Sequence, residues 1–144
     1  MSNQNLNKPE PINRQSRLRQ DFANTEVSTL DIDKWMIVTV GKYGAIHATA
    51  EEFLKFTPGL LEALTNAVIN GERQRAISIL HTLKSLTVIF ASTSIIGQIN
   101  NFGEELLMVS PHALMVQTVS LKETMERLYD DVIQFVAQNA ISLK

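Results

Sequence analysis

The sequence predicts an all-α protein, an up-and-down antiparallel four-helix bundle with an additional N-terminal helix. From residue 28 onward, apolar residues recur at spacings of three and four, as they do on one face of an α-helix. No stretch alternates apolar and polar residues as a half-buried strand would. The connections between the helical stretches are short, so successive helices should lie antiparallel.

Composition divides the chain into two parts. Residues 1–27 are rich in Asn and Gln and hold few large apolar side chains, which predicts a flexible tail. Arg14, Arg17 and Arg19 make this tail basic, and solvation of these side chains is favoured over contact with an anionic surface. Residues 28–144 form the predicted bundle domain.

Two helices are expected before residue 70. Ser28 or Thr29 should cap the first, and "GKYG" at 41–44 should end it. The apolar residues of the first helix are Leu30, Trp35, Ile37 and Val38. Thr49 and Glu52 have the spacing of a capping box for the second helix. The apolar residues of the second are Phe53, Phe56, Leu60, Leu61, Leu64 and Val68. Pro58 predicts either a kink in this helix or its division into two segments.

Three more helices follow the tight connection "NGE" at 70–72. The third is expected over about residues 72–90, with a buried face of Ala76, Ile79, Leu83, Leu86 and Phe90. Ser92 or Thr93 should cap the fourth, whose apolar residues are Ile95, Ile99, Phe102, Leu106 and Leu107. The fifth is long and has a four-three seam of Leu114, Thr118, Leu121, Met125, Leu128, Val132 and Phe135.

Length, charge and composition limit the function. The 144 residues suit one domain, and a net charge of −2 argues against an extended nucleic-acid surface. The absence of cysteine excludes disulfides and thiolate metal sites, and it suits the cytoplasm. No apolar run is long enough for a membrane span, and the N-terminus lacks the apolar region of a signal peptide. We therefore expect a cytoplasmic protein that binds no nucleic acid.

His81 lies within the third predicted helix, in the stretch "AISILHTLKSLTVIF" at 76–90. At about 100° per residue, the apolar stripe of this helix points away from His81. The side chains predicted to flank it are Gln74, Ser78 and Ser85 on one side and Ile77, Lys84 and Val88 on the other. This mixed face argues against a core histidine.

Other roles for His81 find little support. No carboxylate or second histidine lies three or four residues from it, so a zinc site would need distant residues to converge. His47 and His112 sit at predicted helix starts. A hydrolase would need a nucleophile, but the chain has no Cys and no G-x-S-x-G motif. A surface histidine without a function is the simplest alternative.

An exposed histidine can also carry a phosphoryl group. A free imidazole has a pKa of about 6.5, so it is mostly neutral near pH 7 and nucleophilic. Such a site needs a nearby cation to offset the phosphoryl charge and small neighbours that let a partner approach. Lys84 and Ser85 meet these needs beside His81, and Ile77 and Val88 offer apolar contacts.

These residues resemble the histidine-containing phosphotransfer (HPt) domain family. The family's H-x-L-K-G-S helix is similar to "HTLKSL" at 81–86, and Gly71-Glu72 lies at the family's upstream turn distance. "FLKFTPGLLEALTNAVINGE" is similar to the preceding helix, and Ala91 and Ile95 fall where the next helix begins. The resemblance covers about residues 28–138.

The sequence departs from the family pattern at several positions. Ser85 replaces the usual glycine, and Leu86 replaces a small residue. Many members place a Glu or Gln on the following helix to hydrogen-bond the histidine ring, but counting from His81 gives Gly103. Gln98 and Glu104 are the available substitutes.

The resemblance implies a phosphorelay carrier rather than an enzyme. His81 would accept a phosphoryl group from an aspartyl phosphate on a receiver domain and pass it to another, with Lys84 stabilising the phosphoryl oxygens. The partners would be receiver domains of a hybrid sensor kinase, a response regulator or both, docking on Ile77, Ser78, Ser85 and Val88. The chain would have no cofactor of its own, Mg²⁺ being bound by the receiver. A binding module of the same fold without phosphotransfer, and a structural bundle that oligomerises, stay open as alternatives.

Overall fold

The computed structural model describes residues 29–139, which form five α-helices and one short 3₁₀ helix. These elements are α2 (Ile32–Val38), α3 (Tyr43–Ile69), α4 (Arg73–Thr87), α5 (Thr93–Met108), the 3₁₀ helix η1 (Pro111–Leu114) and α6 (Met115–Gln138). Within this part of the chain, the β pairing is a single antiparallel bridge between Leu30 and Ala91. The predicted all-α class is confirmed, whereas the tail predicted for residues 1–27 lies outside the described residues.

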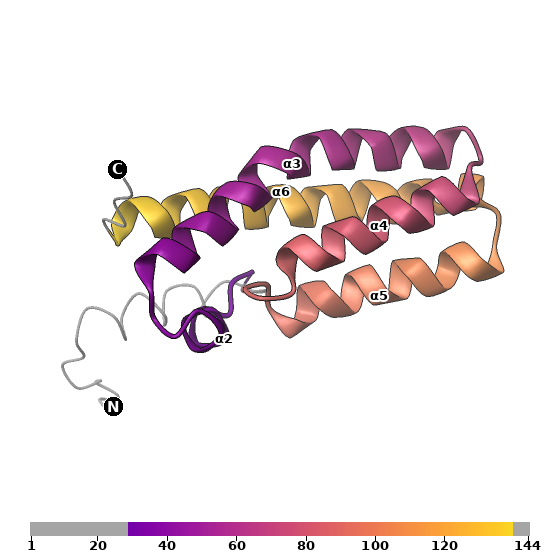
Figure 1. Cartoon of the computed structure of the whole chain (residues 1–144). Coiled ribbons are helices and arrows are strands. Elements are labelled where there is room, and N and C mark those ends of the chain that lie inside the picture. The colour runs from indigo at the N-terminus through magenta and orange to yellow at the C-terminus, as the bar shows by residue number, and fades with distance from the viewer. Residues whose placement is uncertain (1–28, 140–144) are drawn as a thin grey trace, which may run out of the picture.

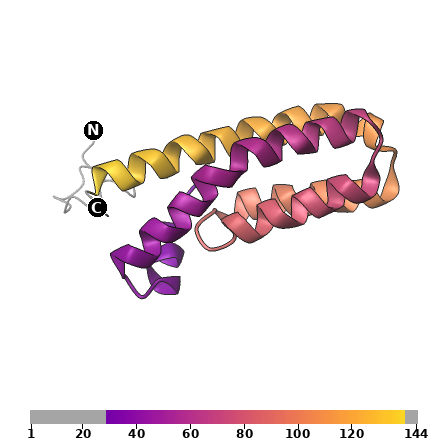
Figure 2. The same ribbon diagram turned by 45° about the horizontal axis from the view of Figure 1, so that its top comes forward.

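The four long helices α3 to α6 run alternately in opposite directions, each beside the next, and α6 returns beside α3 (Figure 1). α3 and α6 have 27 and 24 residues, but α4 and α5 have only 15 and 16. One end of α3 and of α6 therefore extends past the α4–α5 connection (Figure 2). α2 is seen almost along its axis in Figure 1, so it runs roughly perpendicular to the bundle at this end. No helix in residues 29–139 combines the length and the apolar character that a membrane crossing requires.

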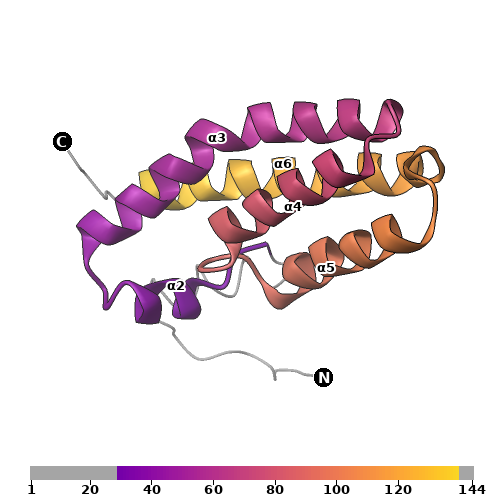
Figure 3. The ribbon, with the colours of Figure 1, turned by 45° about the vertical axis from the view of Figure 1, so that its right-hand side comes forward.

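α3 is one continuous helix that bends along its length (Figure 3). Pro58 lies inside it and has no N–H to donate to the Leu54 carbonyl, which accounts for the bend. The capping box expected at Thr49 is wrong, because Thr49 lies well inside α3. Its hydroxyl donates to the Ala45 carbonyl (3.0 Å) and accepts from the indole nitrogen of Trp35 (3.0 Å).

The start of α2 also differs from the prediction. The helix is capped by Asp31, whose carboxylate accepts from the backbone N–H of Lys34 (3.0 Å). The expected cap Thr29 lies two residues earlier, where its hydroxyl donates to the Asp131 carboxylate of α6. The other expected cap, Ser28, lies outside the described residues. A carboxylate at the first turn suits the positive end of the helix dipole.

The connections around α4 follow the sequence more closely. Gly71 has a φ of 71°, the left-handed conformation that glycine adopts without strain, and it joins α3 to α4. Ser92 caps α5 as predicted, since its side chain accepts from the N–H of Ile95. α4 is shorter than the predicted 72–90, and Phe90 is buried beyond its end, in the turn that leads to α5.

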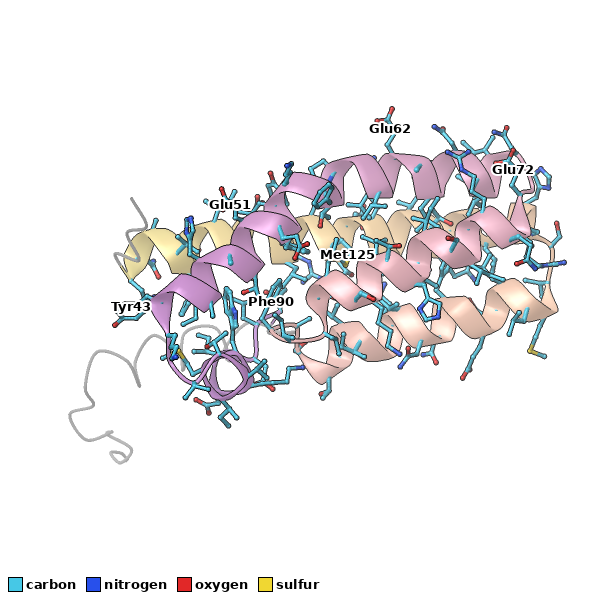
Figure 4. The ribbon with its side chains drawn as sticks, in the orientation of Figure 1. Tyr43, Glu51, Glu62, Glu72, Phe90 and Met125 are labelled. Atoms are coloured by element: carbon cyan, nitrogen blue, oxygen red, sulfur yellow. The ribbon has the colours of Figure 1, made fainter. Side chains whose placement is uncertain are left out.

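The core runs along the bundle axis. The seam predicted for the fifth helix is confirmed, because all of its members are buried, namely Leu114 of η1 and Thr118, Leu121, Met125, Leu128, Val132 and Phe135 of α6. Phe90 and Met125 point into the interior, whereas Glu51 and Glu62 project outward from α3 (Figure 4). Four of the apolar residues counted in these helices are exposed, namely Ile37, Val38, Phe56 and Leu107.

Candidate functional site

α4 presents His81 to solvent. The face of α4 that packs into the bundle consists of Ala76, Ile79, Leu80, Leu83 and Thr87. His81 and Ser85 lie exposed on the opposite side, in agreement with the predicted orientation of the helix. Lys84 is half-buried, one turn after His81, so its aliphatic stem covers apolar surface.

A groove between α4 and α5 runs beside His81. Its volume is about 370 Å³. Its lining residues are Ile77, Leu80, His81 and Lys84 from α4 and Ile99, Asn100, Gly103, Glu104 and Leu107 from α5. The walls are mostly aliphatic, and one cation, one carboxylate, one amide and the imidazole supply the polar groups. His81 and Lys84 thus share a concave surface, which the sequence alone did not indicate.

The imidazole ring of His81 has no partner within residues 29–139. Beyond the hydrogen bonds of the helix, the one bond that His81 makes to a described residue uses its backbone carbonyl, which accepts from the Ser85 hydroxyl (3.1 Å). The amine of Lys84 likewise has no hydrogen bond or ion pair to a described residue. Within the described part of the chain, then, no hydrogen bond or ion pair engages either side chain.

Of the four residues expected to dock a partner, Ile77 lines the groove, whereas the other three lie outside it. Ile77 is half-buried and lines the groove. Ser78 and Ser85 are exposed on the face of α4 that carries His81 but lie outside the groove. Val88 caps the C-terminus of α4 and is 42% exposed. The aliphatic contacts of the groove come from α5 as well as from α4.

Of the two proposed ring partners, Gln98 is wrong. Its amide faces α6, where it donates to the Ser120 hydroxyl (3.4 Å). Glu104 does line the groove with His81, although no hydrogen bond joins them. Gly103 also lines it, and a Cβ built on Gly103 would lie 3.3 Å from Cδ2 of Leu80. α5 therefore lies close to α4 at Gly103. This is the position from which a Glu or Gln side chain was expected to reach the His81 ring.

Asn100 and Leu107 line the groove but were not among the residues predicted for the site, and Leu107 was counted only as an apolar residue of its helix. Leu107 is 69% exposed because its neighbour Leu106 occupies the core. A signal was present in the sequence, since Ile99, Gly103 and Leu107 are spaced by four and so lie along one face of α5.

The other two histidines and the other depressions of the described chain are weaker candidates for a functional site. Nε2 of His47 lies 3.6 Å from a carboxylate oxygen of Glu51, one turn later in α3. His112 lies in η1, with its ring against Gly71. Residues 29–139 contain no group of three or more His, Cys, Asp or Glu side chains suited to a metal ion. Two further depressions, between α3 and α6 and between α5 and α6, contain no histidine.

Comparisons with known proteins add no further assignment. No protein-family model, no curated protein and no solved structure matches the chain.

Proposed function

We propose that this protein is a histidine phosphotransfer protein of a two-component phosphorelay, with His81 as the phosphoryl acceptor. The observation that carries the proposal is the imidazole of His81, which is exposed, has no partner among residues 29–139, and shares a groove with Lys84. The small Ser85 leaves space beside the ring. The resemblance of the 81–86 stretch to the HPt helix supports the same function.

The proposed reaction exchanges one bond to phosphorus for another. The lone pair of the unprotonated ring nitrogen of His81 forms an N–P bond to the phosphorus of an aspartyl phosphate. The P–O bond to the aspartyl carboxylate breaks, and that carboxylate leaves with the electron pair. The other ring nitrogen keeps its proton. Attack by the carboxylate of a second receiver domain reverses these steps, so the protein is a stoichiometric carrier rather than an enzyme.

Lys84 supplies the positive charge that this transfer needs on the carrier. The phosphoryl oxygens carry negative charge throughout, and a cation already held at the site stabilises them without reorganisation. The receiver domains of a hybrid kinase or a response regulator would bring the aspartate and Mg²⁺, in the cytoplasm where such partners act.

The test is transfer from a phosphorylated receiver domain. The wild-type protein should acquire an acid-labile, base-stable label, and His81→Gln should acquire none, because an amide is not a comparable nucleophile. The free energy of unfolding should change by no more than about 0.5 kcal/mol, because His81 is exposed. His47→Gln and His112→Gln are the matched controls and should keep full labelling.

Two outcomes would contradict the proposal. Persistent label in His81→Gln would place the acceptor elsewhere. A protein that binds receiver domains in both forms but is labelled in neither would be the alternative, a binding module of the same fold. Gly103 favours that alternative, because it provides no side chain to orient the ring.

A further inference from the structure

The depression between α3 and α6 has the size of a small-molecule site and shares no residue with the groove beside His81. Its volume is about 490 Å³, against about 370 Å³ for the groove. Small-molecule sites usually measure about 300–1,000 Å³. Its lining comes from α3 and α6, whereas the groove is lined by α4 and α5. A molecule bound here would therefore leave His81 uncovered.

Thr57 gives this depression a polar group that the described fold does not satisfy. Thr57 lines the depression and is fully buried, and its hydroxyl oxygen has no hydrogen-bond partner among residues 29–139. A buried hydroxyl without a partner destabilises a fold, and such groups are few in native proteins. By contrast, the hydroxyl of Thr65, two turns later in α3, donates to the Leu61 carbonyl (3.0 Å). A ligand with a polar atom at Thr57 would supply the missing partner.

Three charged side chains at the rim of the depression favour a cationic ligand. Glu62 of α3 and Glu126 of α6 are both exposed, and neither forms an ion pair with a described residue. Lys122 is the one cation among the described residues of the lining, so two carboxylates face a single amine. A positively charged group therefore gains more from this rim than a negatively charged group does.

The remaining lining is apolar and aromatic. Pro58 and Leu61 of α3 face Tyr129 of α6 across the depression, and Tyr129 is half-buried. Aliphatic and aromatic walls stabilise an apolar ligand body by removing it from water, and the face of a tyrosine ring also attracts a cation. The matching ligand is a small amine with an aromatic body and a hydroxyl group at the opposite end, where Thr57 lacks a partner.

We propose that the depression between α3 and α6 binds a small phenolic amine in its protonated form. The ammonium group lies at the rim between Glu62 and Glu126, and the phenolic hydroxyl bonds to the hydroxyl of Thr57. Because Thr57 is covered in the structure, the ligand reaches it by displacing the exposed charged side chains of the rim. The site is independent of the proposed phosphotransfer function, because it uses none of the residues around His81.

Three probes that differ in one group each test the chemistry of the ligand on the full-length wild-type chain. Tyramine carries both the ammonium group and the phenolic hydroxyl, phenethylamine lacks the hydroxyl, and phloretate has a carboxylate in place of the ammonium group. In an NMR titration, tyramine should shift the backbone amides of the residues that line the α3–α6 depression. It should bind about tenfold more tightly than either analogue, because each analogue loses one of the two polar contacts.

Two pairs of variants assign these contacts to residues. Thr57→Val should reduce the affinity for tyramine to that for phenethylamine, and it should raise the melting temperature because it removes an unsatisfied buried hydroxyl. Thr65→Val is the matched control and should do neither, because its hydroxyl is already bonded to Leu61. Glu126→Gln should weaken tyramine binding by about threefold. The exposed Glu123 lies on the same helix outside the depression, so Glu123→Gln should bind as the wild type does.

Three results would overturn the phenolic-amine site. The first is a tyramine titration that shifts no amide of the depression. The second is binding of phloretate as tight as that of tyramine, since the rim would then show no preference for a cation. The third is an affinity for tyramine that Thr57→Val leaves unchanged. The first two use the wild-type chain, so they decide the proposal even if a variant does not fold, and none of the three concerns the labelling of His81.

Discussion

Among the described residues, Lys84 is the only cation that lines the groove beside His81. Two features of its position have opposite consequences for how a substitution would change the stability of the fold. Because its amine has no partner among the described residues, removing it breaks no ion pair there. Because it lies in the last turn of α4, its charge stabilises the negative end of the helix dipole.

We expect Lys84→Ala to slow transfer from a receiver domain about tenfold, which corresponds to about 1–2 kcal/mol in the barrier. Stability should fall by only about 0.3–1 kcal/mol, through the helix dipole. Rapid-quench transfer kinetics and urea unfolding measure the two effects. The exposed Lys122 of α6 lies outside the groove, so Lys122→Ala is the control. Equal transfer rates in Lys84→Ala and the wild type would remove Lys84 from the mechanism.

The position of His81 was predictable from the sequence, but its surroundings were not. Helical spacing alone assigns His81 to the face opposite Ala76, Ile79 and Leu83. The groove depends on how α5 lies against α4, and that packing is set by contacts between residues distant in sequence. Gly103 was thus recognised as a departure from the family pattern, whereas its contact with Leu80 could come only from the structure.

The ends of α4 and α5 are joined by Arg73. Its Nε donates to the Leu106 carbonyl (2.6 Å) and its Nη2 donates to the Val109 carbonyl (2.9 Å). Both carbonyls lie at the C-terminal end of α5, where the last carbonyls of a helix lack partners within it. One side chain at the start of α4 thus satisfies the end of α5 and holds it in place near Leu107.

We expect Arg73→Ala to lower the free energy of unfolding by about 1–3 kcal/mol, because two hydrogen bonds from a charged donor are lost. Arg75 is the matched control. It is exposed, and its one ion pair to a described residue is with Glu72 (3.2 Å), so Arg75→Ala should change stability by less than about 1 kcal/mol. Chemical denaturation followed by circular dichroism measures both. Equal effects of the two substitutions would mean that the Arg73 hydrogen bonds contribute nothing beyond a surface charge.

Element boundaries were predicted best where the local sequence determines them alone. Ser92 and Gly71 mark their turns through side-chain capping and a positive φ, and both assignments hold. Thr49 has the same local signature as a cap, but it lies inside α3, where its hydroxyl donates to the Ala45 carbonyl and accepts from Trp35 of α2. A capping motif cannot be told from a helix interior when a tertiary contact satisfies the hydroxyl.

Across the whole molecule, the end of the bundle that carries α2 is held by one aromatic cluster. Trp35 is fully buried, with ring centroids 4.7 Å from Phe90 and 5.2 Å from Phe135. Backbone hydrogen bonds add to this cluster, since the N–H of Asp31 donates to the Phe90 carbonyl (2.8 Å). α2, the α4–α5 connection and α6 thus meet at Trp35.

We expect Trp35→Ala to lower the free energy of unfolding by about 3–5 kcal/mol, the usual cost of deleting a large buried aromatic side chain. Trp35→Phe should cost less, because a ring remains and Thr49 keeps its bond to the Ala45 carbonyl. Tyr43 is 62% exposed, so Tyr43→Ala is the control and should change stability by less than about 1 kcal/mol. Urea unfolding followed by circular dichroism compares the three variants.

The Trp35→Ala substitution also tests whether the end of the bundle that carries α2 is energetically separate from the candidate site. His81 lies exposed in the middle of α4, whereas Trp35 is fully buried against Phe90 and Phe135, so the small phosphoryl donor phosphoramidate should label folded Trp35→Ala at the wild-type rate. A stability loss below about 1 kcal/mol would show that α2 is not anchored through Trp35. Loss of labelling in a variant that is still folded would show instead that the packing of α2 controls the orientation of α4. The reactivity of His81, the proposed phosphoryl acceptor, would then depend on the whole bundle.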